Sequence, residues 1–336
     1  MNIKNRIGTV LLVLTLIDLH AQKSYKTYKA YKEIACAGNG SWDYLSVDVQ
    51  GRRLYVSHGD KVEVIDVDKD EKIGEIAAGK SVHGIAIARA EGKGFISNSK
   101  SNDITVFDLN NNTVTKTIPS TGSGVDAINY DLFTHTVLVH NSKTSNITVI
   151  NAATAEVKGT VENLGKLESG AADGKGFYYV NLEKENAIAK IDIQTMKLVA
   201  TFSLAAESAP AGLAIDTKNG LLFCGARSNN LVVMNTSDGK IVTTLPIPDH
   251  NDAVVFDAET RLLYVSTISG EIMVLMQENR DGYKVEQRVA TKFLSKTMAI
   301  DTKTKKIYLP SADFDGTDEK KSKMLPESFK ALVFKQ

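Results

Sequence analysis

One apolar unit recurs seven times along the chain and constrains its fold more than any other feature. Each copy contains a short apolar run that ends in a polar residue, as in Leu54-Tyr55-Val56-Ser57. The copies are spaced by 40, 43, 41, 44, 41 and 44 residues when they are aligned on Val56, Ile96, Val139, Val180, Cys224, Val265 and Leu309. A period of this size over six intervals indicates a repeat architecture whose units pack against one another.

Each repeat contains four runs of β-forming residues. The first two flank a tight turn, as around 217–220, the third alternates in polarity, as in Ile104–Asp108, and the fourth resembles Ile241–Leu245. β-Branched and aromatic residues between Gly, Asn and Asp turns are strand signals, and no long window has a helical period. Four antiparallel strands per repeat are typical of a propeller blade, so the sequence predicts an all-β, seven-bladed β-propeller.

The last repeat lacks its fourth strand, and a spare strand lies at the other end of the chain. Residues 296–309 supply two strands of this repeat and 328–334 supply a third, whereas a spare β-type run occupies 28–34. We therefore expect the N-terminal strand to complete the last blade and close the ring, which protects the sheet edges. The long segment 313–326 is expected to fold over the channel mouth.

Residues 1–21 have the pattern of a secretory signal peptide. Lys4 and Arg6 precede an apolar stretch at 7–17 that is too short to span a bilayer, and Ala21 stands at the expected cleavage site. A buried apolar strand is the alternative interpretation. The signal peptide predicts an exported protein, periplasmic or secreted, with a single propeller domain at 22–336.

Charge and motif content exclude several classes of protein. The chain has 40 basic and 40 acidic residues, and removal of Lys4, Arg6 and Asp18 with the signal peptide leaves 38 and 39, a net charge of −1. This balance argues against a generally basic nucleic-acid binder. Two cysteines exclude a disulfide framework, and no haem-attachment, phosphate-loop or nucleophile-elbow motif is present.

The repeated Leu-Tyr-Val-Ser and Ile-Asp-Val patterns resemble the YVTN-repeat (YncE-like) family of seven-bladed propellers. The segments that carry this resemblance are 210–216, 252–257 and 297–301, at the first strands, and 309–314 in the last blade. The resemblance implies an exported propeller, related more distantly to the quinoprotein amine dehydrogenase β-chain type. It implies the fold more strongly than the function, because propellers host many unrelated activities.

The starts of the first strands are expected to surround one mouth of the central channel. The residues aligned five positions before the ends of these strands are Asp43, His83, Asp126, Glu168, Ala211, Asp252 and Lys296. The four carboxylates and the imidazole together suit a divalent cation, Ca²⁺ or Mg²⁺ before Zn²⁺ or Mn²⁺. Alternatively, each carboxylate caps its own turn, or Lys296 neutralises part of the set without a metal.

The loops that follow the second strands give a second set of candidates around the same mouth. His58, His140, Asn141 and Arg227 stand at or just beyond these strands. Arg227 is suited to bind a carboxylate or phosphate, but we favour the alternative that these are ordinary solvated loop residues. His250 adjoins Asp252 as a candidate ligand or acid/base, and Trp42 is the only tryptophan, placed either to stack on a ligand or to plug the channel.

Three functions remain open at this stage. A non-catalytic binding scaffold, expected to be monomeric, would present the channel mouth to a protein, a glycan or a small anionic ligand. A metal-dependent hydrolase or lyase, lactonase-like, would use the carboxylates and His83 to hold a metal and activate water. Single-stranded nucleic-acid binding would need loop lysines and Trp42, but the net charge opposes it. We favour the binding scaffold over the enzyme.

Overall fold

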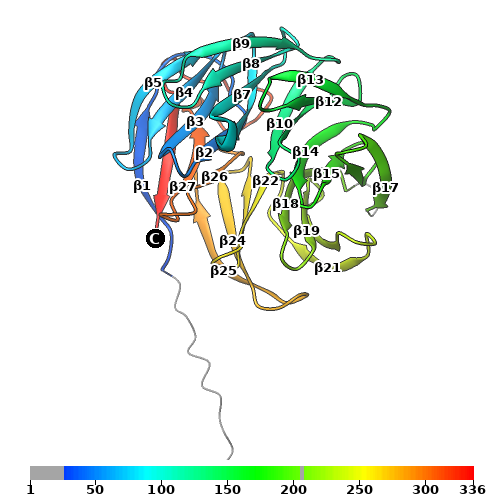
Figure 1. Ribbon diagram of the computed structural model, residues 1–336. Coiled ribbons are helices and arrows are strands. Elements are labelled where there is room, and N and C mark those ends of the chain that lie inside the picture. Colours follow the sequence, from blue (N-terminus) through cyan, green and yellow to red (C-terminus); the bar gives the residue numbers. More distant parts are fainter. Residues whose placement is uncertain (1–25, 205–207) are drawn as a thin grey trace, which may run out of the picture.

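Seven four-stranded antiparallel sheets stand around a common axis, as Figure 1 shows. The computed structural model describes residues 26–204 and 208–336, so the predicted signal peptide at 1–21 lies outside the described residues. The prediction of an all-β propeller with seven four-stranded blades is confirmed. Among the described residues the only helix is the 3₁₀ turn η1 (Arg89–Glu91), and no helix is long and apolar enough to cross a bilayer.

The strands follow one another around the ring in sequence order. The first three blades are β2 Leu45–Asp48, β3 Arg53–His58, β4 Lys61–Asp66 and β5 Glu71–Ala77; β6 Val82–Ala88, β7 Lys93–Asn98, β8 Asp103–Asp108 and β9 Val114–Pro119; and β10 Val125–Asp131, β11 Thr136–Asn141, β12 Asn146–Asn151 and β13 Glu156–Val161. The next three are β14 Leu167–Ala172, β15 Phe177–Leu182, β16 Ala187–Asp192 and β17 Lys197–Ser203; β18 Pro210–Asp216, β19 Leu221–Ala226, β20 Asn230–Asn235 and β21 Ile241–Pro246; and β22 Asn251–Asp257, β23 Leu262–Thr267, β24 Glu271–Gln277 and β25 Tyr283–Ala290. The last is β26 Ala299–Ile300, β27 Ile307–Ser311, β28 Lys330–Lys335 and β1 Lys29–Ala35.

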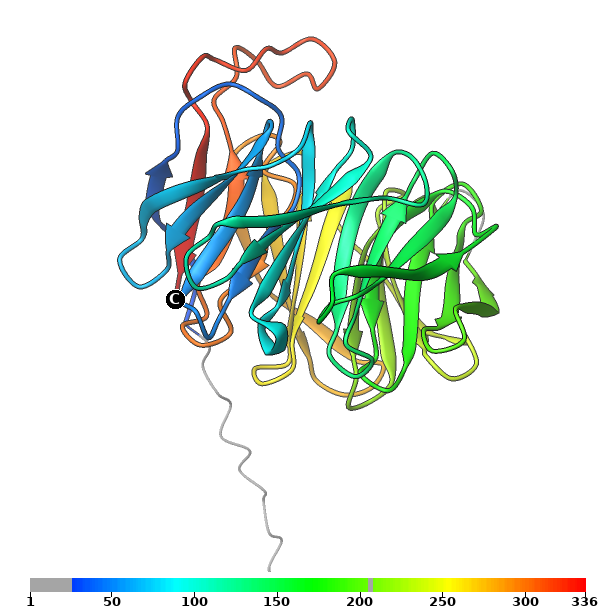
Figure 2. The same ribbon diagram turned by 45° about the horizontal axis from the view of Figure 1, so that its top comes forward.

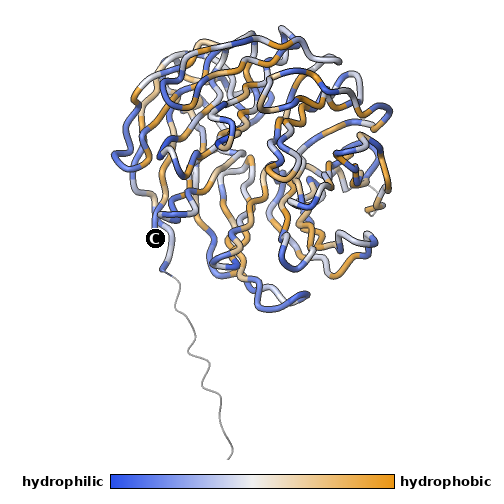
Figure 3. Tube along the Cα trace, viewed as in Figure 1, coloured by the Kyte–Doolittle hydropathy of each residue, from blue (hydrophilic) through white to orange (hydrophobic). Residues whose placement is uncertain are grey.

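The hydrophobic core lies between neighbouring sheets. One cluster of buried side chains, for example, joins Tyr55 and Val64 of the first blade to Ile85 and Phe107 of the second. Figure 3 shows hydrophobic residues along the strands and hydrophilic residues in many of the connecting loops. Because each sheet needs a neighbour on both faces, the ring must close to bury the last pair of faces.

The N-terminal strand closes the ring, as the repeat pattern predicts. Strand β1 pairs antiparallel with β28, so that Ile34 lies opposite Ala331, and Ile34 is buried. The strand thereby supplies the outermost position of the last blade, beside the first blade of the chain. Residues near the two ends of the described chain thus hold one another in place.

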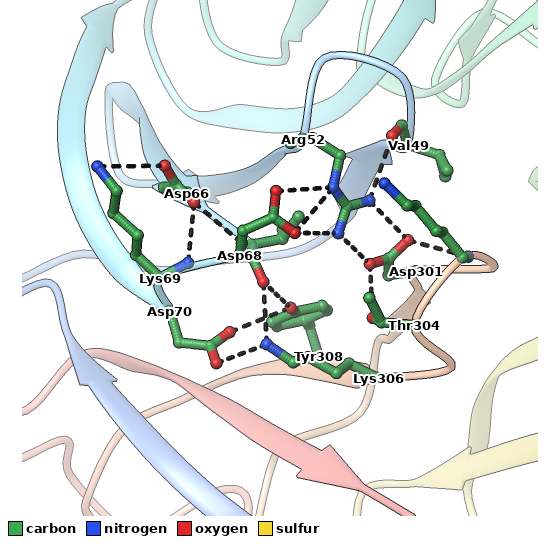
Figure 4. Close-up of polar contacts among 12 residues, drawn as sticks. Val49, Arg52, Asp66, Asp68, Lys69, Asp70, Asp301, Thr304, Lys306 and Tyr308 are labelled. Atoms are coloured by element: carbon green, nitrogen blue, oxygen red, sulfur yellow. Dashed lines mark hydrogen bonds and ion pairs between the residues drawn. The ribbon is translucent and has the colours of Figure 1, made fainter.

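A second set of contacts fastens the same seam at the channel face opposite the starts of the first strands (Figure 4). The guanidinium of Arg52 binds both carboxylate oxygens of the buried Asp301, at 3.0 and 2.7 Å. Lys306 Nζ lies 2.6 Å from Asp70 Oδ2, and the Tyr308 hydroxyl donates to Asp70 Oδ1 at 3.3 Å. These contacts join the first and last blades, and paired carboxylates tolerate burial far better than isolated ones.

The segment between β27 and β28 rises above the ring on the other face, beside the chain that follows β1 (Figure 2). A β-bridge between Phe314 and Met324 holds this excursion together. Glu327 fastens it to the neighbouring loop, because its carboxylate accepts the Gly38 amide at 2.6 Å and the Asn39 side-chain amide at 3.3 Å. The excursion therefore forms one wall of the channel mouth, and a pocket remains between the excursion and the ring of blades.

Candidate functional site

The residues aligned at the starts of the first strands lie around one mouth of the channel and form ion pairs with one another. We call Asp43, His83, Asp126, Glu168, Arg227, Asp252 and Lys296 the charged ring. Six of these seven occupy the aligned positions predicted from the repeats, and Arg227 is the seventh. Their side chains are partly exposed, which places them at the boundary between the protein and the solvent in the mouth.

Four blades hold the backbone of the aligned mouth residue in the next blade. Ser97 Oγ donates to the carbonyl of Asp126 at 2.5 Å, and His140 Nδ1 bonds the carbonyl of Glu168 at 2.7 Å. The Asn181 side chain donates to the Ala211 carbonyl at 2.9 Å, and Ser266 donates to that of Lys296. Because these donors end second strands and are buried, the positions of the ring residues depend on the packing of adjacent blades.

One arc of the ring is a carboxylate–imidazole–carboxylate bridge. His83 Nδ1 lies 2.8 Å from Asp43 Oδ2 and 3.3 Å from Asp126 Oδ1. Burial opposes ionisation of His83, but its hydrogen bonds with Asp126 and Asp43 raise its pKa to about 10. Burial raises the pKa of Asp43. At Asp126 burial also opposes ionisation, but the hydrogen bond from His83 and the positive charge of His83 outweigh it and lower the pKa of Asp126. His83 therefore carries a positive charge at neutral pH and joins the two carboxylates.

Lys296 extends the pairing to the next carboxylate. Its Nζ lies 3.0 Å from Asp252 Oδ2 and 3.9 Å from Asp43 Oδ1. Burial favours neutral Lys296, but the charges of Asp252 and Asp43 raise the pKa of the ammonium above its ordinary value. Lys296 is thus one of three cations of the ring that each lie between two carboxylates, and Asp126 and Glu168 are the two carboxylates that have no cation between them.

Arg227 completes the ring at the blade whose aligned residue is Ala211. Its Nη2 lies 3.5 Å from Asp252 Oδ1 and 3.9 Å from Glu168 Oε1, and its Nη1 binds Glu183. Lys166 pairs with Glu168 at 3.0 Å and also with Glu183, outside the ring. Burial nevertheless raises the pKa of Glu168 to about 7, against the opposing charge of Arg227.

Three ring residues have the geometry of a metal site. One ligand atom from each of Asp43, His83 and Asp126 can be chosen so that all three lie within 4.8 Å of one another. Carboxylate oxygens and an imidazole nitrogen suit Ca²⁺, Mg²⁺, Zn²⁺ or Mn²⁺ to different degrees. The other two predicted ligands, Glu168 and Asp252, are instead paired with Arg227 and Lys296. The ring thus offers at most a three-residue site on one side.

Tyr44 is a channel residue that the aligned charges did not reveal. Burial raises its pKa well above the ordinary value, and Asp43, Asp126, Glu168 and Asp252 all add to this rise. The residues aligned with it in the other six blades are all small: Gly84, Ala127, Ser169, Gly212, Ala253 and Thr297. One large side chain among six small ones is the sequence signal that could have identified it as a residue that lines the channel.

The structure does not bring three of the loop candidates into the mouth as exposed groups. His58 is buried, 2.8 Å from Glu63 and stacked on Phe329 with ring centroids 3.9 Å apart. His140 is buried, and its Nε2 lies 2.8 Å from the Tyr178 hydroxyl, so burial lowers its pKa to about 4. Asn141 is buried too and donates to Asn146 and Thr148. Their roles in these positions are to support the blades and, for His140, to position Glu168.

The remaining two loop candidates differ in their surroundings. His250 has a side chain that is 57 % exposed, and its Nδ1 lies 3.3 Å from Oδ2 of Asp249, which is outside the ring. Trp42 packs on Phe329 and Phe314, with ring centroids 5.4 and 6.0 Å apart. Trp42 therefore joins the excursion between β27 and β28 to the first blade.

A pocket of about 430 Å³ lies between this excursion and the ring. We call it the mouth pocket; its walls are formed by Asn39, Gly40, Ser41, Trp42, Leu294, Lys296, Phe314 and Met324. Lys296 is the single charged residue among them, and most of the remaining large side chains are apolar or aromatic. Such a lining, with few polar groups, is typical of small-molecule sites.

Comparison with known proteins supports the fold and leaves the activity open. A family model described as a domain of unknown function (DUF4221) matches residues 161–323. No protein with a curated description matches the sequence. The hydrazine synthase of Kuenenia stuttgartiensis is similar in structure, with a TM-score of 0.69 and 15 % identity, over 84 % of this chain and 94 % of that one.

Two further solved structures are similar as well. The WD40 repeats of RRP9 have a TM-score of 0.77 and 11 % identity, over 92 % of this chain and 97 % of that one. U3-55K has a TM-score of 0.76 and 11 % identity, over 91 % and 98 %. At these identities the similarity shows the propeller fold alone, because one fold hosts many functions.

Proposed function

We propose that this protein is an exported, non-catalytic binding module that takes a small ligand in the mouth pocket. The observation that carries the proposal is the composition of that pocket, in which Trp42, Phe314 and Met324 face one charged group, Lys296. A largely apolar pocket with a few converging polar groups is the usual form of a small-molecule site. The rigid ring and the Glu327 contact to the loop at Gly38 keep its walls in place without a ligand.

The lining suggests a ligand with an apolar or aromatic body and one anionic group. The body would pack against Trp42 and Phe314, and the anion would approach Lys296, the one charged side chain in the lining. Lys296 already contacts Asp252 and Asp43, so the anion would share the ammonium with them rather than meet a free cation. A ligand that is neutral but otherwise similar should therefore bind less tightly, by a modest factor.

Export and family membership are parts of the same proposal. The charged start and apolar stretch at 1–21 support a signal peptide, with the propeller domain at 22–336. The Leu-Tyr-Val-Ser and Ile-Asp-Val repeats support a YVTN-repeat (YncE-like) relationship. An exported location, periplasmic or secreted, would bring the mouth pocket into contact with ligands outside the cytoplasm.

The sole tryptophan gives a direct test. Trp42 fluorescence is measured while aliphatic and aromatic carboxylates and their uncharged amides are titrated into the wild-type protein. We expect a saturable change in fluorescence. In Lys296→Gln the affinity for the carboxylates should fall several-fold, and the affinity for the amides should stay the same. Lys184→Gln, in an exposed loop, is the matched control and should bind like wild type. The proposed ligand class is wrong if no compound changes the Trp42 fluorescence, or if Lys296→Gln alters the affinities for carboxylates and amides by the same factor.

A second candidate, a metal-dependent hydrolase or lyase, is favoured by the cluster of Asp43, His83 and Asp126. These residues would hold the ion, and a bound divalent cation would supply an activated water. Elemental analysis of protein purified without chelator tests this. The double variant Asp43→Asn/Asp126→Asn is compared with the control Asp249→Asn, which changes an exposed carboxylate. About one ion per chain, lost only in the first variant, would support it and justify assays on lactones and esters. Protein without stoichiometric metal would remove this candidate.

A further inference from the structure

A second pocket opens on the same face as the mouth pocket, between the first two blades. Its volume is about 580 Å³, and most of its lining is polar or charged, including His58, Asp60, Lys61, Glu75 and Lys100. We call it the polar pocket. The loops that form it follow β3 and β7 and precede β6, so they belong to the set of loops around the channel mouth.

The polar pocket and the mouth pocket share one wall. Asn39, Gly40 and Ser41 line both of them. The Glu327 amide donates to Asn39 Oδ1 at 3.2 Å, and the Gly59 amide donates to the Ser41 carbonyl at 2.7 Å, so the wall is held at both ends. Asn39 and Ser41 are exposed, which places the crest of the wall in solvent. A ligand seated in the mouth pocket can therefore extend over this wall into the polar pocket.

Most charged groups of the polar pocket are already paired with other charges. Asp60 Oδ2 lies 2.8 Å from Lys80 Nζ. Lys61 Nζ lies 2.7 Å from Glu75 and 3.2 Å from the buried Glu63. Because both signs of charge stand side by side, a charged guest would be attracted by one group and repelled by its neighbour. Hydroxyl groups avoid this conflict, since each one can donate to a carboxylate and accept from an ammonium.

His58 gives a second, independent indication of a polar guest. It is 1 % exposed, its Nδ1 lies 2.8 Å from Glu63 Oε1, and its buried Nε2 has no hydrogen-bond partner among the described residues. The ring edge that carries Nε2 faces Gly38 and Gly40, where a Cβ would come within 3.2 Å of Cε1 and 3.5 Å of Cδ2, so no side chain of this loop covers it. Buried polar atoms are nearly always hydrogen-bonded, and a hydroxyl suits Nε2 whether or not it carries a proton.

We propose that the polar pocket binds a sugar, and that the ligand of this protein is a glycoside in which the sugar is linked to an apolar or aromatic acid. This inference rests on the proposed function, because the acid would occupy the mouth pocket with its carboxylate near Lys296. The link would cross the wall at Gly40, which has no side chain to obstruct it and whose φ of 150° favours glycine. The sugar hydroxyls would then meet the paired charges of Asp60, Lys61 and Glu75.

The test compares three ligands that share one aromatic acid and differ only at its para oxygen. 4-Methoxybenzoate carries a methyl group there, 4-carboxyphenyl β-glucoside carries a sugar, and 4-(carboxymethoxy)benzoate carries a second anion. Calorimetric titration measures the affinities, while Trp42 fluorescence reports the mouth pocket. We expect the glucoside to bind roughly tenfold more tightly than 4-methoxybenzoate, as a few added hydrogen bonds would allow.

The second anion should gain less than the sugar. It would be attracted by Lys100, the one lining cation that has no ion pair in the described part of the chain, but it would also be repelled by Asp60 and Glu75. The third ligand therefore tests whether the polar pocket selects hydroxyl groups or simply a negative charge.

Filling the polar pocket should remove the gain. Ala77 is exposed at the end of β5 and lines the polar pocket but not the mouth pocket. In Ala77→Phe the affinity for the glucoside should fall to that for 4-methoxybenzoate, whose own affinity should not change. Ala290→Phe, at the exposed end of β25 in another blade, is the matched control and should bind all three ligands as wild type does. Unfolding midpoints establish that both variants are folded.

The outcomes separate this inference from the proposed function. If 4-methoxybenzoate binds in the mouth pocket but the glucoside binds no more tightly, the sugar site is wrong and the proposed function stands. A gain that persists in Ala77→Phe, or a larger gain from the second carboxylate than from the sugar, also overturns the sugar site. If none of the ligands binds, both proposals fail. A gain from the sugar that is lost in Ala77→Phe and kept in Ala290→Phe supports the site.

Discussion

Arg227 supplies the positive charge at the one position of the charged ring where the aligned residue, Ala211, has none. Both residues belong to the fifth blade, Ala211 at the start of β18 and Arg227 just after β19. The guanidinium reaches Glu168 on one side and Asp252 on the other, at 3.9 and 3.5 Å. The small side chain of Ala211 therefore leaves space at this position of the ring, and the longer side chain of Arg227 extends across it.

Replacement of Arg227 should destabilise the propeller. In Arg227→Met the carboxylates of Glu168, Glu183 and Asp252 lose a shared partner in a partly buried site, so the free energy of unfolding should fall by about 1–3 kcal/mol. Urea unfolding measures the change, and Lys184→Met, in an exposed loop, is the control. An unchanged midpoint would show that solvent already compensates these carboxylates.

His83 and His140 should titrate on opposite sides of the usual histidine range. Two carboxylates hold His83 protonated with a pKa of about 10, whereas burial keeps His140 neutral with a pKa of about 4. NMR titration of the imidazole signals, assigned with His83→Gln and His140→Gln, measures both values. Two ordinary titrations near pH 6.5 would contradict the bridge at His83 and the burial of His140.

Glu168 should make the protein less stable as the pH rises through the mildly acid range. Its pKa is raised to about 7 in the folded protein from an ordinary 4.5, so between these values the folded state holds a proton that the unfolded state has released. Stability from this group is therefore complete below about pH 4.5, declines up to about pH 7, and is constant above it. The unfolding midpoints of wild type and Glu168→Gln are measured from pH 4 to 7. The difference between the two proteins at each pH gives the contribution of Glu168.

If that difference is flat with pH, or if wild type gains stability relative to Glu168→Gln as the pH rises, the pKa of Glu168 is not raised. His83 does not confuse the comparison, because its own contribution is present in both proteins. That contribution, from a raised histidine pKa, is complete below about pH 6.5 and is lost only as the pH approaches 10.

The seam between the first and last blades should depend on Arg52. Asp301 is fully buried and binds Arg52 through both oxygens, so Arg52→Gln leaves an uncompensated carboxylate and should cost about 3 kcal/mol of unfolding free energy. Chemical denaturation measures it, with exposed Lys69→Gln as control. Asp301→Asn combined with Arg52→Gln should cost less than the sum of the two single changes. Additive losses would show that the two residues do not interact.

Much of the fold could be predicted because the signals for it are local. Alternating apolar residues, polar turns and the repeat spacing act within a few residues, and they predicted the seven blades. The closing strand could be predicted by counting the strands in each repeat, because the last repeat lacked one and a spare strand containing Ile34 lay near the N-terminus. In the structure this strand pairs with β28.

The candidate site could be predicted only where the repeats align residues at one place. The alignment brought together Asp43, His83 and Asp126, which do lie within ligand distance of one another. It did not identify Tyr44, whose signal is its size among small residues. His58 and His140 stand at strand ends, where the sequence does not tell whether a side chain faces the channel or packs between sheets; both are buried.

The sequence by itself determined the number of blades, their strand order and the closure at β1, because each of these follows from a short-range pattern repeated along the chain. The tertiary structure alone decided which charges meet. Arg227 and Glu168 are far apart in the sequence, as are Arg52 and Asp301, and each pair forms only when neighbouring blades pack at a given angle and distance. Ion pairs weaken with separation and with solvent, so their partners depend on the assembled ring rather than on the repeat.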